Sequence, residues 1–144
     1  MCWIGKNACR IARRNIVVYK MGSISENIFI SLYQNYIYEI GKINKDIVLI
    51  PDMRYDINGV FRMEDPLCTI YRGYHSYTSI GMSYSDLGLY SRTIYLGKLP
   101  YTLRLINYCY IATFIIPEGS NYFENDRGEI VSSNIIYTGK YIKL

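Results

Sequence analysis

The chain of 144 residues is half hydrophobic, which is long and apolar enough for one domain, 1–144, with a substantial core. No apolar run approaches the roughly 18 residues of a membrane-spanning helix, and no secretory signal precedes the four cysteines, so we expect a cytoplasmic protein with reduced thiols. The net charge of +4 comes from positions 1–25, which hold five basic side chains and no acid; so short a basic segment is typical of a solvated face and does not favour nucleic acid as the partner.

The first half of the chain is rich in short β-branched runs. Residues 15–20, Asn-Ile-Val-Val-Tyr-Lys, predict the first strand because they follow a polar stretch and precede a Gly-Ser punctuation. Residues 23–34 allow two interpretations. Ser23 and Glu26 are spaced as a helix-capping box, with apolar residues after them at helical spacing, whereas the density of isoleucine, phenylalanine and tyrosine favours a strand. A further strand is predicted at 36–40, which ends before a glycine.

The middle of the chain alternates between strand, turn and helix signals. Residues 46–50 predict a strand that stops at a proline, and Asn58-Gly59 predicts a hairpin turn. Residues 85–98 are the best remaining helix candidate because a serine can cap them and apolar residues recur at three and four positions. Residues 105–116 are apolar at both odd and even positions, so both faces of a strand there would be apolar. This pattern predicts a central strand covered on both faces.

The C-terminal quarter predicts a hairpin meander. Its short strand candidates are separated by turn residues and lie at 122–123, 129–131, 134–137 and 141–144. No internal repeat or linker interrupts the chain. The elements together predict an α+β fold: a mainly antiparallel β-sheet or open barrel-like sheet with one or two short helices.

The segment 71–79, Tyr-Arg-Gly-Tyr-His-Ser-Tyr-Thr-Ser, is the most function-like stretch and holds the single histidine. An arginine offers a planar fork to phosphate, tyrosine rings offer faces to a base, and a glycine lets the backbone approach a ligand. The alternative is a strand end whose rings only pack and whose imidazole is satisfied internally. On the functional interpretation, the ligand-binding residues are Arg72, Tyr74, His75, Tyr77 and Ser79.

Motifs of catalysis and of metal or phosphate chemistry are missing from the sequence. No Gly-x-Ser-x-Gly elbow, Gly-x-Gly-x-x-Gly or Gly-Lys-Ser/Thr loop occurs, and one histidine with scattered acids is poor material for a metal site. We therefore expect no catalytic residue, metal or cofactor. One enzymatic alternative stays open, because Arg72, Thr78-Ser79 and Glu129 loosely match the stations of ADP-ribosyltransferases, although Arg127 stands where many such enzymes carry a second acid or amide.

Several blocks of the chain resemble small uncharacterised proteins of gut-bacterial phages and their hosts. The blocks extend from near residue 15 to near residue 137 and are 15–20, 38–42, 73–77, 116–122 and 128–132. That family has no assigned activity, so the resemblance carries no functional residue to this chain. It implies a phage accessory protein that acts in the host cytoplasm, with counter-defence, virion structure or modification of host components as its possible roles.

These observations predict a non-enzymatic protein that binds or sequesters a nucleotide-like small molecule, as a counter-defence protein would. The first alternative is a phage structural or protein-interaction module that forms a homo-oligomer through its tyrosine-rich strands. The second is the ADP-ribosyltransferase-like enzyme. None of the three involves a membrane.

Overall fold

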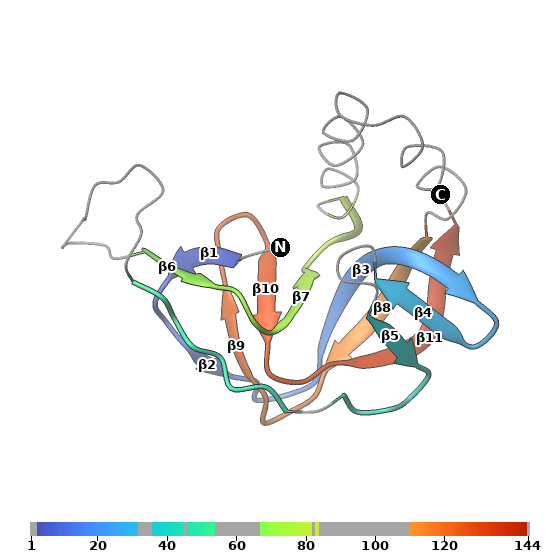
Figure 1. The fold of residues 1–144 in the computed structure, drawn as a ribbon, viewed down its shortest axis with the longest axis horizontal. Helices are drawn as coiled ribbons and strands as arrows, with labels where there is room; N and C mark the ends of the chain where they lie inside the picture. Colours follow the sequence, from blue (N-terminus) through green and yellow to red (C-terminus); the bar gives the residue numbers. More distant parts are fainter. Residues whose placement is uncertain are drawn as a thin grey trace.

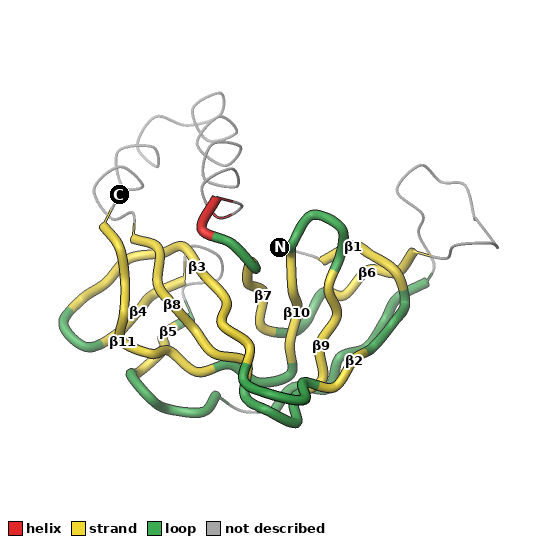
Figure 2. The backbone as a smooth tube through the Cα atoms, turned by 180° about the vertical axis from the view of Figure 1, so that it is seen from behind, coloured by secondary structure: helices red, strands yellow, loops and turns green. Residues whose placement is uncertain are grey.

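A computed structural model describes residues 3–31, 36–44, 46–53, 67–81, 83 and 110–143. These residues are almost entirely β-structure, as Figures 1 and 2 show. The strands are β1 (Trp3–Lys6), β2 (Arg10–Ile11), β3 (Ile16–Ser25), β4 (Ile28–Ser31), β5 (Ile37–Glu39), β6 (Leu67–Ile70), β7 (Tyr74–Tyr77), β8 (Tyr110–Ile116), β9 (Asn121–Glu124), β10 (Glu129–Ser132) and β11 (Ile136–Lys143).

The prediction of an α+β fold with short helices is wrong, because the described chain is nearly all β-sheet. The helical interpretation of 23–34 fails at its first turn: Glu26 has a φ of 55°, and β3 and β4 pair antiparallel from Gly22↔Ser31 to Ser25↔Ile28. The β-branched and aromatic side chains there pack on a sheet, which outweighs the capping signal. The helix predicted at 85–98 and the Asn58-Gly59 hairpin lie outside the described residues.

Five strands close a small barrel around an aromatic core. β3 pairs with β8 and β4, β8 pairs with β11, and β4 pairs with β5. The ring closes between β11 and the residues after β5, where the Gly41 N–H donates to the Tyr137 carbonyl (2.8 Å) and the Asn44 N–H donates to the Ile135 carbonyl (3.2 Å). These contacts pair the backbone at the start of β11, which would otherwise be an open sheet edge there.

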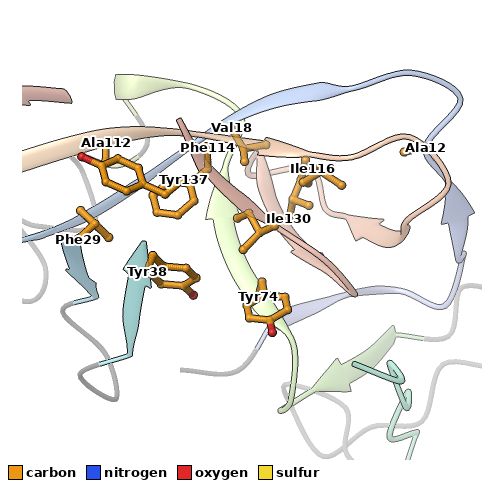
Figure 3. Packing of buried hydrophobic residues seen from close by; sticks show 11 residues of the cluster. Ala12, Val18, Phe29, Tyr38, Tyr74, Ala112, Phe114, Ile116, Ile130 and Tyr137 are labelled. Carbon is orange, nitrogen blue, oxygen red and sulfur yellow. The ribbon is translucent and has the colours of Figure 1, made fainter. Parts of the chain in front are cut away.

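The barrel interior is filled by rings, as Figure 3 shows. Phe29 packs edge-on against Phe114 at 5.2 Å between ring centroids, and Tyr38 packs edge-on against Phe114 at 5.0 Å. Tyr137 lies 5.2 Å from Phe114 and 5.7 Å from Phe29, so the three rings contact one another. These tilted and edge-to-face contacts are the arrangements that aromatic quadrupoles favour, so the ring pairs add stability beyond the area that they bury.

Beyond the barrel the sheet continues through β7, β10, β9 and β2, and the β1–β6 ribbon covers it. Trp3 is fully buried there, packs against Phe123 at 5.6 Å, and donates its indole N–H to the Glu129 carbonyl (2.9 Å). Cys68, Ile70 and Val131 are the other buried residues of this second core. β7 thus lies between two cores, one on each of its faces.

The C-terminal strands do not form a continuous meander. β9 and β10 form the predicted hairpin, with the turn at Asn125–Gly128, but β10 next pairs with β7 and β11 pairs with β8. β8 lies between β3 and β11, as expected for a strand that is apolar on both faces. Residues 46–50 are extended but belong to no ladder.

Candidate functional site

The predicted ligand-binding residues lie on β7 and at its two ends, and the strand separates them. Alternation along β7 places Tyr74 on the barrel side and His75 and Tyr77 on the opposite face. Tyr74 and Tyr77 are only 4% and 6% exposed, whereas Arg72 and Ser79 are exposed. Three surface grooves are lined by described residues; one of these includes Arg72, and none of the three includes Tyr74, His75 or Tyr77.

The transferase-like stations are also separated. Glu129 lies opposite Tyr77 in the β7–β10 register, beside Thr78, whose N–H donates to the Gly128 carbonyl (2.8 Å). Arg72 precedes Tyr77 by five positions, which is about 16 Å of extended chain. The arginine and glutamate therefore lie at opposite ends of β7.

Lys20 is the unexpected residue of the barrel interior. It is 7% exposed, its ammonium donates to the His75 carbonyl, and its Nζ lies 5.5 Å from the centroid of the Tyr38 ring. Desolvation lowers the pKa of Lys20 from 10.5 to about 8. The ring face and the carbonyl dipole partly offset the cost of burying the charge.

Three tyrosines, Tyr36, Tyr38 and Tyr74, form a cluster of contacting rings. The Tyr36 ring lies 4.7 Å from that of Tyr38 and 6.0 Å from that of Tyr74, which Figure 3 places beside Tyr38. Burial raises the pKa of Tyr38 above its ordinary value, and the neighbouring Tyr74 and Tyr36 raise it further. Burial also raises the pKa of Tyr74, and its hydrogen bond with Tyr36 adds to that effect. Tyr38 and Tyr74 are therefore neutral at physiological pH, and their rings pack in the core.

His75 is held neutral on the other face of β7. Its Nδ1 lies 3.1 Å from the Gly73 carbonyl, and its Nε2 is buried without a hydrogen-bond partner within the described structure. Desolvation by burial, with a smaller contribution from the charge of Lys20, lowers the pKa of His75 from 6.5 to about 4.

Acidification should therefore destabilise the protein through His75. The unfolded chain takes up a proton near pH 6.5, whereas the folded chain does so only near pH 4. The contribution of His75 to the free energy of unfolding is therefore constant above pH 6.5. It falls by about 3 kcal/mol as the pH decreases from 6.5 to 4. Urea denaturation of wild type and His75→Gln at pH 7, 5.5 and 4 measures this loss of stability. The variant should lose less stability over that window; parallel losses would contradict the assignment.

The clearest candidate site is a groove lined by three arginines, which we call the arginine groove. It encloses about 970 Å³ between the residues around β2 and the start of β3. Arg10 lies on β2, and Arg13 and Arg14 occupy the bend that follows. The remaining lining residues come from these segments and from β9, β10 and the end of β7: Cys9, Ile11, Asn15, Ile16, Val17, Thr78, Tyr122, Glu124 and Ile130.

The charge in this groove is strongly asymmetric. Glu124 is its single carboxylate among the lining residues, and its Oε2 lies 3.7 Å from Arg10, a distance at which a partly exposed pair stabilises little. Arg13 and Arg14 are exposed, and no salt bridge involves either within the described part of the chain. At least two guanidinium groups are therefore available to an anion.

The local sequence explains why the arginines stay outside the core. Ala12, between Ile11 and Arg13, is buried: its N–H donates to the Ser120 carbonyl (2.9 Å) and its carbonyl accepts from the Gly119 N–H (2.8 Å). Anchored there, the chain turns with the long side chains at 13 and 14 on the solvent side. The five basic residues before Glu26 were the available signal, but sequence alone could not show that three share a groove with Tyr122 and Thr78.

Comparisons of the chain with protein-family models, with curated proteins and with solved structures found no match. Among the residues the structure describes, no three His, Cys, Asp or Glu side chains are grouped as a metal site would require. In the same part of the chain no helix has the length and apolar character to cross a membrane.

Proposed function

We propose that the protein binds a phosphate-bearing small molecule of nucleotide type in the arginine groove and holds it chemically unchanged. The observation that carries the proposal is the gathering of Arg10, Arg13 and Arg14 around one groove with a single carboxylate. A guanidinium fork matches two phosphate oxygens at once, and its charge does not depend on pH in the physiological range.

The rest of the groove suits the remainder of a nucleotide. Tyr122 is half-buried and supplies a ring on which a base can stack, and Thr78 supplies an exposed hydroxyl. The volume of about 970 Å³ lies at the upper end of small-molecule sites. In a phage accessory protein, such capture would withdraw a nucleotide signal from host defence.

The proposal predicts that nucleotides raise the melting temperature and that removing two exposed arginines reduces this rise. Arg13→Ala combined with Arg14→Ala should weaken binding at least about tenfold, because each charged hydrogen bond contributes roughly 1.5–3 kcal/mol. A thermal-shift screen over linear and cyclic nucleotides identifies the ligand, and calorimetry measures the loss. Arg127→Ala is the matched control, because Arg127 is exposed and does not line this groove.

Two further measurements separate nucleotide capture from other outcomes. Glu124→Gln should tighten binding about two- to fivefold by removing the one carboxylate, and added salt should weaken binding of every variant. The ligand released by heat should have its original mass. Recovery of a cleaved product would place the protein among enzymes. A thermal shift with nucleotide that is the same in the double variant would show that the nucleotide does not bind in the arginine groove.

A further inference from the structure

Residues 46–53 present a stripe of alternating side chains to solvent, on a part of the surface distinct from the arginine groove. Asp46, Val48, Ile50 and Asp52 share one side of this extended segment. Val48 is 79% exposed and Ile50 is 71% exposed, more than any other large hydrophobic residue of the described chain.

The opposite side of the segment is anchored firmly. Ile47 packs against the barrel core, and Leu49 packs against the core around Trp3. The stripe is therefore held in place by both cores, and its exposure does not come from a loose loop. An apolar surface that is already fixed and extended loses little conformational entropy when a partner binds to it.

The backbone of this segment is also available. The Ile47 N–H donates to the Ser133 carbonyl (2.9 Å), and Asp52 exchanges two hydrogen bonds with Thr69 (2.8 and 2.9 Å). Between these anchors, Val48, Leu49 and Ile50 form no backbone hydrogen bond with any other described residue. Unpaired extended backbone of this kind is a template on which another strand can add.

The residues of the stripe line a groove of about 390 Å³. Tyr71, which is more than half exposed, and Arg72 line the same groove. Asp46 and Asp52 stand at the two ends of the stripe, six positions apart, with the two aliphatic side chains between them. An occupant must therefore match an apolar centre flanked by carboxylates.

We propose that this groove binds an extended peptide segment of a partner protein, which adds as a strand beside Val48–Ile50. The peptide presents apolar side chains at two alternate positions, against Val48 and Ile50, and a basic side chain on each flank, against Asp46 and Asp52. Tyr71 covers the apolar side chains, and the Arg72 guanidinium donates to peptide carbonyls.

Charge favours this occupant over a second copy of the chain. A two-fold antiparallel pairing centred on Leu49 would place Val48 against Ile50 of the other copy, but it would also place Asp46 against Asp52 at both ends. Like charges directly opposite each other destabilise a strand pair. A partner peptide with a basic residue at each end would instead be attracted to Asp46 and Asp52.

An array of acetylated, amidated seven-residue peptides tests the pattern. Each peptide carries valine, isoleucine or tyrosine at its third and fifth positions and lysine, serine or glutamate at its first and seventh. Peptides with lysine at both ends should be retained, and the best of them should bind in solution at least tenfold more tightly than its glutamate counterpart. Retention without charge preference, or of no peptide, would overturn the proposal.

Variants and amide exchange then locate the peptide. Val48→Ser should weaken its binding at least tenfold, whereas Val17→Ser, at a half-exposed valine outside this groove, should not. The amides of Val48–Ile50 should become protected from hydrogen exchange only when peptide is added. Protection that instead rises with protein concentration alone would identify a second copy as the occupant and would refute the peptide assignment.

Discussion

Gly22→Ala should destabilise the protein by about 3 kcal/mol or more, with loss of the barrel. A Cβ at position 22 would lie 2.1 Å from the carbonyl oxygen of Ile30 and 2.6 Å from Cζ of Phe29. The carbonyl belongs to β4, which pairs with this part of β3, so relief requires separating the two strands. Urea denaturation followed by circular dichroism measures the loss.

The control is a glycine at which an added Cβ meets no described neighbour. A Cβ at Gly81 has no atom of the described residues within 4 Å, and its φ is not in the left-handed range, so Gly81→Ala should change stability by less than about 0.5 kcal/mol. If the two alanine variants unfold at the same urea concentration, β3 and β4 do not approach each other as described, and the barrel is not closed in this way.

Lys20→Met should stabilise the protein at pH 7 by about 2 kcal/mol. The folded chain holds the Lys20 pKa at about 8, against 10.5 without burial. Carrying the charge in the folded state therefore costs about 3 kcal/mol at any pH below 8. Methionine removes this cost but also removes the hydrogen bond to the His75 carbonyl, which contributes about 1 kcal/mol, so the net gain is about 2 kcal/mol. Methionine fills the space of the lysine stem without a charge.

The pH dependence of this effect distinguishes it from better packing alone. Wild-type stability should rise between pH 8 and pH 10.5, because the unfolded chain retains the Lys20 proton over that range and the folded chain does not. The advantage of Lys20→Met should therefore be smaller at pH 9.5 than at pH 7. A methionine variant that is less stable than wild type at pH 7 would show that the ammonium contributes net stability.

Strands could be predicted from sequence where the signal was local. Residues 15–20 carry their β-branched pattern whatever they pair with, and β3 includes most of them. Pairing could not be predicted in the same way. The turn residues between β10 and β11 suggested a hairpin, but Ile136 pairs with Ile115 and Tyr137 with Phe114 because the barrel core takes the Tyr137 ring. Such contacts depend on partners far away in the chain.

For the candidate site, too, the sequence indicated local features but not the long-range contacts between them. The composition of 71–79 favoured a ligand pocket, yet a strand must send Tyr74 and His75 to opposite faces, and both faces of β7 are covered by a core. The arginine cluster was visible as charge before Glu26. Its meeting with Tyr122 and Glu124 depends on the pairing of Arg10 with Tyr122 across β2 and β9, which no local pattern encodes.

Alkylation of Cys9 tests ligand binding in the arginine groove most directly, because its thiol is free, exposed and part of the groove lining. The rate of Cys9 modification, followed by peptide mass spectrometry, should fall when the nucleotide found in the thermal screen is added. The double variant at Arg13 and Arg14 should lose this protection, and Arg127→Ala should keep it. A nucleotide that stabilises the protein while Cys9 reacts at its original rate would show that the ligand binds elsewhere.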